Sequence, residues 1–433
     1  MDVARSDPMT APAAPPHRPA PPADGGRPLT VLLVHNVYQR PGGEDRVFET
    51  EGGLLEDHGH RVLRYTLHND AVDGMSRLAL AARTVWSRRA AAAVGRTVRA
   101  EGVDVVHVHN TLPLASPSVF WAARRGGAAT VHTLHNFRTV CPGALLFRDG
   151  YVCRDCVGRA LALPAVRHGC YRGSAAATAA VAATTAVHRA AGTYRRRVDR
   201  FVALSEGARD LFVAGGLPAR KVAVKPNALA RDPEPGPGGA AVLFAGRLTE
   251  EKGVRVLLRA WAAHTDLPAL AVAGDGPLAG EVEAAAAADA RITALGWQGG
   301  PALDALMGRS ALLVAPSLWY EGWPLVATEA MGQGTPVVAT DHGAFAEMVE
   351  PGRTGFLFPR ADADALAARV RRALADPDRL AVMRRATWRS FRDRFSRGAN
   401  YRRLRSIYAD ALAERRGGAA PSDSVAPPGG AVL

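Results

Sequence analysis

Short apolar runs rich in β-branched residues alternate along most of the chain with longer stretches of helical periodicity. Each run ends in polar residues, which is typical of buried parallel strands. Stretches rich in Ala, Leu and Arg lie between most of them, and this alternation predicts doubly wound α/β sheets. The expected strands are Leu29–Asn36, Arg61–Tyr65, Val103–His109, Ala129–Leu134 and Arg200–Leu204, followed by Ala241–Ala245, Ala269–Ala273, Arg291–Leu295, Leu312–Ala315 and Pro336–Ala339.

A segment that cannot form regular structure divides this alternation into two halves. Residues 231–239 read RDPEPGPGG, where Pro and Gly interrupt both helix and strand. A chain of 433 residues also exceeds one compact core. We therefore predict two Rossmann-like domains with a cleft between the carboxyl ends of their strands, where this fold class binds nucleotides. The predicted units are disordered tails at 1–28 and 417–433, domains at 29–227 and 241–386, a linker at 228–240, and a helix at 387–416 that crosses back to the first domain.

The excess of basic residues is confined to the first predicted domain and the C-terminal segment. Residues 30–227 carry 27 basic and 15 acidic side chains, whereas residues 241–386 carry 14 and 17. This asymmetry favours an anionic partner for the first domain, such as acidic lipid or a phosphorylated substrate. Nucleic acid is disfavoured, because the chain has no zinc finger, RRM signature or heptad-linked basic region. The alternative interpretation is an arginine-rich surface that only reflects the composition of a GC-rich genome.

No export or membrane-spanning segment is expected. The first tail lacks a basic region followed by an apolar one, so it is not a signal peptide. The most apolar helical candidate, residues 175–187, is short and consists mostly of Ala and Thr. Together with only four cysteines, these features favour a protein of the reducing cytosol.

A basic octet follows the first strand of the second half. Residues 246–253 read GRLTEEKG, which places Arg247 and Lys252 at a strand-to-helix turn. A guanidinium offers a planar fork to phosphate oxygens, the ammonium adds a movable charge, and the following helix N-terminus adds positive potential. The octet is equally compatible with a surface turn held by salt bridges.

The most informative stretch is a pair of glutamates eight positions apart. Glu321 precedes the turn Gly322–Leu325, and Glu329 lies about two helical turns further on. Pro324 suits the first turn of a helix, whose unpaired amides can bind a diphosphate. The two carboxylates can then hold sugar hydroxyls. A helix with an exposed acidic face is the simpler interpretation, but it leaves the sequence Gly322-Trp323-Pro324-Leu325 unexplained.

The ordered series GRLTEEKG, GDGP at 274–277 and E-x7-E containing EGWPL resembles the retaining glycosyltransferases of family 4 with the GT-B fold. The similarity runs from about Leu29 to Tyr408. It implies transfer of a sugar from a nucleotide diphosphate sugar, UDP- or GDP-linked, with retained anomeric configuration and without a divalent metal or other cofactor in catalysis. By position, Arg247 and Lys252 are expected to bind the diphosphate, Glu321 to face the donor sugar, and Glu329 to hold the ribose hydroxyls.

The first half supplies matching pieces. Gly42 and Gly43 lie between the first strand and a helix, where backbone amides can approach a ligand closely. In the family the corresponding loop lies beside the donor phosphate and the acceptor. His135 ends a strand and is expected to point into the cleft, and the resemblance places it beside the reacting sugar. We assign His109 a supporting role at most.

The four cysteines fall within thirty residues, as Cys141-x11-Cys153-x2-Cys156-x13-Cys170. A C-x2-C pair flanked by two further cysteines predicts a structural zinc site that stabilises a loop near the acceptor cleft. The spacing is not that of a familiar zinc ribbon. An iron–sulfur cluster or four independent thiols are the alternatives.

Two other functions fit the same architecture, a nucleotide-sugar epimerase and a non-catalytic sugar-nucleotide binding protein. The E-x7-E motif, the cleft histidine and the paired basic residues favour the transferase, with catalytic roles for His135, Glu321, Arg247 and Lys252. The basic stretch Arg83–Arg99, with Trp86, suits a helix lying on anionic lipid. We therefore expect a peripheral enzyme at the cytoplasmic membrane face that glycosylates a lipid-linked or other glycan precursor of bacterial polysaccharide. A soluble small-molecule acceptor is the alternative.

Overall fold

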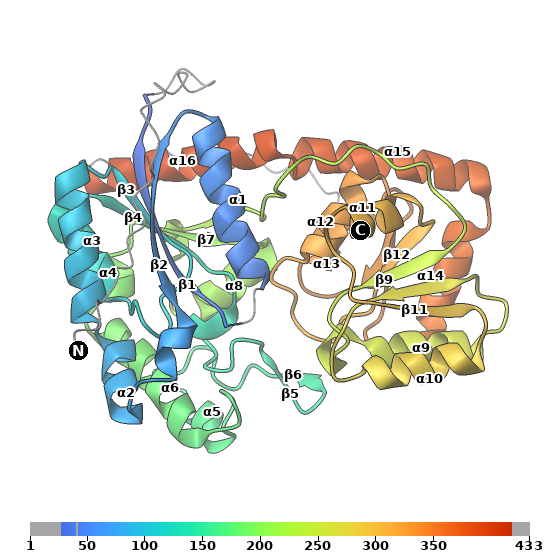
Figure 1. The fold of residues 1–433 in the computed structure, drawn as a ribbon, viewed down its shortest axis with the longest axis horizontal. Helices are drawn as coiled ribbons and strands as arrows, with labels where there is room; N and C mark the ends of the chain where they lie inside the picture. The colour runs from blue at the N-terminus through green and yellow to red at the C-terminus, as the bar shows by residue number, and fades with distance from the viewer. Residues whose placement is uncertain (1–26, 40–41, 418–433) are drawn as a thin grey trace, which may run out of the picture.

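A computed structural model describes residues 27–39 and 42–417. The two predicted tails, apart from residues 27, 28 and 417, lie outside the described residues. The chain forms two α/β halves that lie side by side (Figure 1). An extended segment that ends before residue 242 leads from the first half to the second, and the C-terminal helices return to the first half after residue 394. The predicted fold class is confirmed, and all ten predicted strands are present with ends within three residues of the prediction.

The first sheet has six parallel strands in the order β2-β1-β3-β4-β7-β8. β1 pairs with β2 on one side and with β3 on the other. The chain therefore adds strands in one direction up to β2 and in the opposite direction from β3 onward. Such a reversal leaves a crevice at the carboxyl ends of the strands, where ligands bind in this class of sheet. The strands are β1 (Thr30–Val37), β2 (Arg61–His68), β3 (Val105–Val108), β4 (Ala129–Thr133), β7 (Arg200–Ala203) and β8 (Val222–Val224).

Helices cover both faces of this sheet. Val31 and Leu33 of β1 pack under α1 (Gly43–Asp57) and α16 (Arg397–Arg415), whereas the alternate residues of β1 pack under α3 (Arg88–Glu101) and α4 (Ser118–Gly126). This is the two-residue period of a strand that is buried on both sides. The other helices of this half are α2 (Arg77–Val85), α5 (Leu163–Arg167), α6 (Ala175–Ala190), α7 (Thr193–Arg196), α8 (Glu206–Ala214), and the 3₁₀ turns Asn69–Val72, Phe137–Thr139 and Ala219–Lys221.

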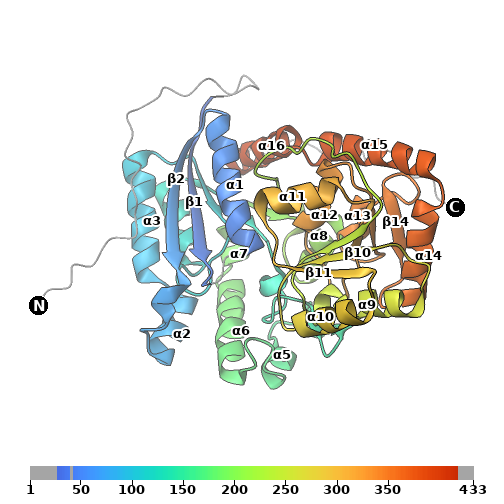
Figure 2. The ribbon, with the colours of Figure 1, turned by 45° about the vertical axis from the view of Figure 1, so that its right-hand side comes forward.

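The second sheet has the strand order β11-β10-β9-β12-β13-β14, and it reverses between β9 and β12. Helices again cover both faces (Figure 2). The strands are β9 (Val242–Ala245), β10 (Leu270–Ala273), β11 (Ile292–Gly296), β12 (Leu312–Ala315), β13 (Val337–Thr340) and β14 (Gly355–Phe358). The helices are α9 (Val254–Ala263), α10 (Ala279–Ala288), α11 (Gly300–Gly308), α12 (Leu325–Gly332), α13 (Phe345–Met348), α14 (Ala363–Leu374) and α15 (Pro377–Arg394), with a 3₁₀ turn at Glu250–Lys252.

The expected single C-terminal helix is two helices. α15 ends at Arg394, and Ser396 starts α16 by accepting a hydrogen bond from the Ala399 amide. The apolar stripe is shared between the domains, because Phe391 and Phe395 pack in the second domain whereas Leu404 and its neighbours pack on the first sheet.

The stretch Arg83–Arg99 is also interrupted. α2 ends at Val85, and α3 begins at Arg88 after Ser87 caps it. Val94 and Val98 of α3 are buried in the first core. The expectation that this helix lies on lipid with its apolar face is therefore wrong, because that face packs on the sheet.

Candidate functional site

The loops at the carboxyl ends of the two sheets meet across a cleft. A Cβ atom added to Gly43 would lie 3.8 Å from Leu325 of the other domain, and one added to Gly322 would lie 3.5 Å from the carbonyl oxygen of His135. Both reversal points of strand order open on this cleft, since the loops after β1 and β12 border them. The sequence motifs of both halves therefore face one another.

Buried Glu321 and partly buried Lys252 form an ion pair in the second domain. The Lys252 ammonium lies 2.6 Å from Glu321 Oε1, to which the Ser317 hydroxyl also donates at 2.8 Å. Burial acts to raise the pKa of Glu321, but Lys252 and these hydrogen bonds outweigh it, so the pKa is lowered below its ordinary value. Glu321 is therefore an ionised carboxylate at neutral pH. Gly343, with φ of 60°, allows the close approach, because a side chain there would meet the Glu321 backbone at 3.0 Å.

Arg247 lies at the mouth of the same loop and is largely exposed. Its guanidinium is 3.3 Å from the Glu251 carboxylate, one turn further on. The two basic groups of the octet are thus each paired with a carboxylate of their own domain, Arg247 with Glu251 and Lys252 with Glu321. An arriving diphosphate would compete with Glu251 for an exposed guanidinium, and an exposed ion pair of this kind contributes little free energy.

The turn Gly322–Leu325 leads into α12. Pro324 has an extended backbone and is the N-cap of α12, whereas it was expected in the first helical turn. The first amide that donates a helical hydrogen bond is that of Ala327. The Leu325 and Val326 amides therefore precede the helical ladder and offer positive potential to an anion. The Trp323 side chain is buried against Phe395, and its indole N–H donates to the Thr328 hydroxyl at 2.9 Å. Only the backbone of Trp323 can therefore contact a nucleotide-sugar donor.

Glu329 faces the first domain from the second turn of α12. The Arg46 guanidinium of α1 reaches across the cleft to Glu329 Oε1 at 2.7 Å. The ion pair links the two domains through their predicted donor-binding helices. A ribose whose hydroxyls bind Glu329 would displace the Arg46 guanidinium from this carboxylate.

Gly42 is the N-cap of α1, and its amide donates to the Asp45 carboxylate at 2.7 Å. The same carboxylate accepts from the Tyr38 amide and lies 2.8 Å from His35 Nε2. Asp45 therefore fixes the two described ends of the glycine loop. This residue had no role in the predictions.

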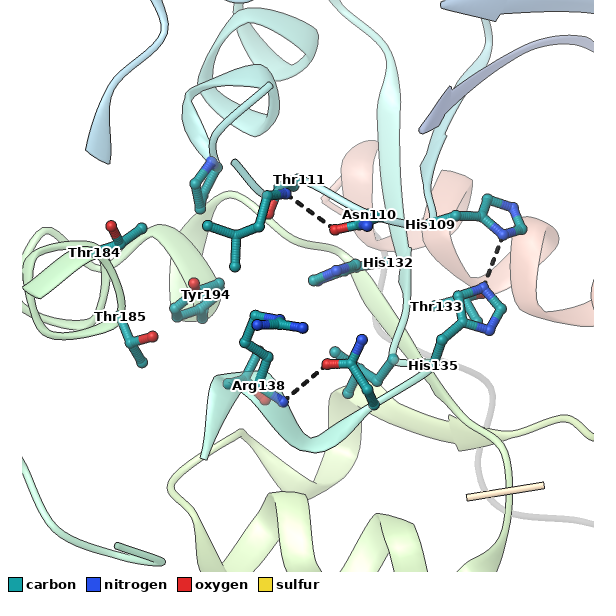
Figure 3. Close-up of a pocket in the computed structure, with 15 residues that line it drawn as sticks. His109, Asn110, Thr111, His132, Thr133, His135, Arg138, Thr184, Thr185 and Tyr194 are labelled. Carbon is teal, nitrogen blue, oxygen red and sulfur yellow. Dashed lines mark hydrogen bonds between the residues drawn. The ribbon is translucent and has the colours of Figure 1, made fainter. Parts of the chain in front are cut away.

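His135 follows β4 and is half-buried. Its Nε2 lies 2.9 Å from His109 Nδ1, and the two rings are stacked (Figure 3). Burial lowers the pKa of His135 well below 6.5, and nearby His35 adds to the shift, so the imidazole is neutral at physiological pH. A neutral ring both donates and accepts one hydrogen bond.

Two family profiles match the chain in succession. The profile "Glycosyl transferase 4-like domain" matches residues 42–228, and "Glycosyl transferases group 1" matches residues 239–376. Together they include the glycine loop, His135, the basic octet and the E-x7-E motif. The chain belongs to the family 4 type of glycosyltransferases.

Relatives of this glycosyltransferase include the lipopolysaccharide core biosynthesis mannosyltransferase LpcC of Rhizobium leguminosarum, 31% identical over 192 residues, which is 42% of this chain and 53% of the relative. The D-inositol 3-phosphate glycosyltransferase of Salinispora tropica is 36% identical over 193 residues, 41% of this chain and 40% of the relative. The chain thus spans about half or less of the curated relatives it matches.

Solved structures match the glycosyltransferase over nearly its whole length. Anabaena HepE in complex with UDP has a TM-score of 0.63 at 18% identity, covering 88% of this chain and 100% of that one. The sucrose-phosphate synthase of Thermosynechococcus elongatus also has a TM-score of 0.63, at 19% identity, covering 89% and 100%. These likenesses confirm the predicted GT-B fold.

A buried polar network behind His135 in the glycosyltransferase was not predicted. Glu51 of α1 is fully buried, lies 3.5 Å from His109 Nε2 and forms an ion pair with Lys225. Lys225 also donates to Asn400 of α16 at 2.9 Å. The burial of Glu51 could have been predicted from the sequence, because Glu51 lies on the same helix face as the apolar residues Val47, Phe48, Leu54 and Leu55.

Glu51, His107 and His109 are the one set of three His, Cys, Asp or Glu ligand atoms within 4.8 Å of one another among the residues that the structure describes. The Lys225 ammonium already neutralises Glu51, and burial lowers the pKa of His107 to about 4. Lys225 pairs with Glu51 Oε1, whereas Glu51 Oε2 and His109 Nε2 are buried without a hydrogen-bond partner among the described residues.

A cavity of about 40 Å³ lies beside His135, between the ends of β3 and β4 and helix α6. His132, Arg138 and Tyr194 point into it, and His135 borders it on the side of His109 (Figure 3). Burial lowers the pKa of His132 to about 3, so this ring is neutral as well. The volume holds one or two waters, so the cavity is an extension of the cleft in the glycosyltransferase rather than a sugar site by itself.

Proposed function

We propose that this protein transfers a sugar from a nucleotide diphosphate sugar to a glycan or lipid-linked acceptor with retention of anomeric configuration. The observation that carries the proposal is the Lys252–Glu321 ion pair, with Glu321 buried, beside the N-terminus of α12. It puts an ionised carboxylate, an ammonium and unpaired helix amides at one point of the cleft. An epimerase or a simple binding protein has no need of that combination.

The charges divide the work of the reaction. The departing diphosphate would be stabilised by Lys252, Arg247 and the first amides of α12, which are in place before the reaction begins. Basic side chains at these positions can neutralise the leaving group as a divalent cation would. UDP is bound by the structural neighbour HepE, which supports a nucleoside diphosphate in the corresponding cleft.

The surroundings of Glu321 favour attack by the acceptor on the same face of the sugar from which the leaving group departs. Lys252 and Ser317 already hold Glu321 Oε1, which makes the carboxylate a poor nucleophile and a good acceptor for sugar hydroxyls. Neutral His135, oriented by His109, would contact the reacting sugar from the other domain.

Donor binding and transfer are tested together. A thermal-shift screen of UDP-, GDP- and ADP-sugars should identify one donor, which at a hundred times its dissociation constant stabilises the protein by about 2.7 kcal/mol. With that donor and a lipid-linked acceptor, NMR should show a product with the anomeric configuration of the donor. Epimerised donor, or binding with no transfer to lipid-linked or soluble acceptors, would contradict the proposal.

We further propose that the first domain docks on anionic lipid to reach its acceptor. Among the described residues, no helix is long and apolar enough to cross a membrane. α2, α5 and α6 lie side by side at one end of the first domain (Figures 1 and 2), and they and their flanking loops expose an apolar surface beside arginines. This surface consists of Leu78, Trp86, Leu161, Leu163 and Val187.

Vesicle flotation tests this docking surface. The protein should float with phosphatidylglycerol vesicles at low salt, less at high salt and not with neutral vesicles, because each basic residue near such a surface contributes about 1 kcal/mol. Leu78, 83% exposed, and Trp86 should matter most, so Leu78→Asp with Trp86→Ala should abolish flotation. Val382→Asp, at an exposed apolar position on α15, is the matched control and should float normally. Absence of flotation at low salt would refute the membrane claim and leave the transferase proposal standing.

A further inference from the structure

The cysteine-containing segment between β4 and α6 has little regular structure of its own. It includes two-residue strands β5 (Phe147–Arg148) and β6 (Tyr151–Val152) and the short helix α5. All four cysteines of the chain lie in it, three half-buried and Cys156 buried, and none forms a disulfide. A segment of this kind needs a source of stability other than its backbone ladders.

Backbone contacts bring the four cysteines together. Gly143, two residues after Cys141, packs so closely on Cys170 that an added Cβ would lie 3.0 Å from its carbonyl oxygen and 3.2 Å from its Cβ. The Cys153 amide donates to the Leu146 carbonyl at 2.8 Å, which ties the C-x2-C pair to the same loop. Cys156 lies in the turn that follows Cys153, where the Val157 amide donates to the Arg154 carbonyl at 3.0 Å.

Arg148 lies in the same segment, and its guanidinium donates to the Asp155 carboxylate inside the C-x2-C pair at 3.4 Å. Four thiolates around a divalent cation carry two net negative charges, which a guanidinium in this segment would partly balance.

The backbone of the segment is strained. Of the six non-glycine residues with left-handed φ in the described chain, four lie here: Ala144, Leu146, Asp149 and Arg172. Such conformations are unfavourable for residues with a side chain and persist where surrounding structure over-determines them. Short strands and turns supply few such constraints, whereas a fourfold metal cross-link supplies them directly.

We propose that Cys141, Cys153, Cys156 and Cys170 bind one structural Zn²⁺. Four thiolates in a tetrahedron suit zinc. No three of these sulfurs lie within 4.8 Å of one another in the described residues. Binding of zinc would therefore require the cysteine turns to move closer together than in the arrangement described here.

The site would also order one contact across the cleft. Arg154 lies between the two cysteines of the C-x2-C pair, and its guanidinium donates to the Tyr320 hydroxyl and lies 5.2 Å from the centre of that ring. Tyr320 directly precedes Glu321. Zinc at the base of the turn would hold Arg154 against the other domain, next to the proposed donor site.

The test uses the full chain, purified under reducing conditions without chelators. Elemental analysis should find about one zinc per chain and no iron. Because the chain has only four cysteines, thiol titration reads the site without background. The thiols should be unreactive until a chelator removes zinc, and cobalt in place of zinc should give the visible bands of tetrahedral thiolate coordination.

Two variants complete the experiment. Cys153→Ser with Cys156→Ser should lose zinc, whereas Arg154→Ala should keep full zinc content and lose only the contact with Tyr320. Wild-type protein without zinc and with four reactive thiols would overturn the proposal, and so would iron with sulfide in place of zinc. Neither result bears on sugar transfer, which is measured separately.

Discussion

Replacing Lys252 with alanine should lower turnover by about 10²- to 10³-fold, the loss expected when one charge-stabilising group is removed from a preorganised site. Lys252 is the only one of the two predicted basic groups that is held inside the cleft, 2.6 Å from Glu321. Its ammonium is therefore fixed before the diphosphate leaves. Steady-state kinetics with the donor identified by thermal shift gives the ratio directly.

The same substitution leaves the Glu321 carboxylate, 5% exposed, without its partner. Part of any loss could then come from an unstable fold. The double variant Lys252→Ala with Glu321→Gln removes that buried charge, so it should recover stability while turnover stays low. The control is Arg255→Ala, three residues after Lys252, which removes an exposed ion-pair partner of Glu281. Its turnover should stay within a few-fold of wild type. Turnover near wild type in Lys252→Ala would refute the assignment.

Lys225→Met should destabilise the first domain by about 3–5 kcal/mol, because it leaves a charge uncompensated in a core. Glu51 and Lys225 are both fully buried, and Lys225 also bonds Asn400 at 2.9 Å. Hydrogen exchange of the β1 and β3 amides measures the opening free energy of this domain separately from the other.

Adding Glu51→Gln to Lys225→Met should recover most of the lost stability, because a neutral amide costs less to bury than an unpaired carboxylate. Arg61→Ala on β2 breaks an exposed pair with Glu101 in the same domain and should cost at most about 1 kcal/mol. A single-variant loss no larger than that of Arg61→Ala would show that Glu51 and Lys225 do not act as a buried pair.

Alternation of strands and helices was predictable because both sheets are parallel and covered on two faces. Each central strand is then a continuous apolar run, which is a strong signal. Four of the described strands were missed. β8 and β14 lie at the edges of the two large sheets, where β8 has only three residues, and β5 and β6 form a separate pair of two residues each. The motif residues were placed correctly at strand ends, since the loop after a parallel strand always opens on the same side.

The buried network and the helix breaks were less accessible to sequence reasoning. The pairing of Glu51 could not be predicted, because charged side chains are seldom fully buried and its partner Lys225 is 174 positions away. α3 was taken for a lipid-binding helix because periodicity shows that a helix has an apolar face but not what covers it. In the structure the first sheet covers it.

The placement of α16 bears on how the protein is made. Leu404, Ile407 and Tyr408 lie against Val31 and Leu33, so the last described helix completes the packing of the first sheet. Residues of β8 leave the ribosome long before that helix exists, and at 5–20 residues per second the interval is about 10 to 40 s. During that time the nascent first domain presents an apolar stripe on β1 to solvent, the kind of surface that chaperones bind. Its final fold is reached only after the second domain has been synthesised.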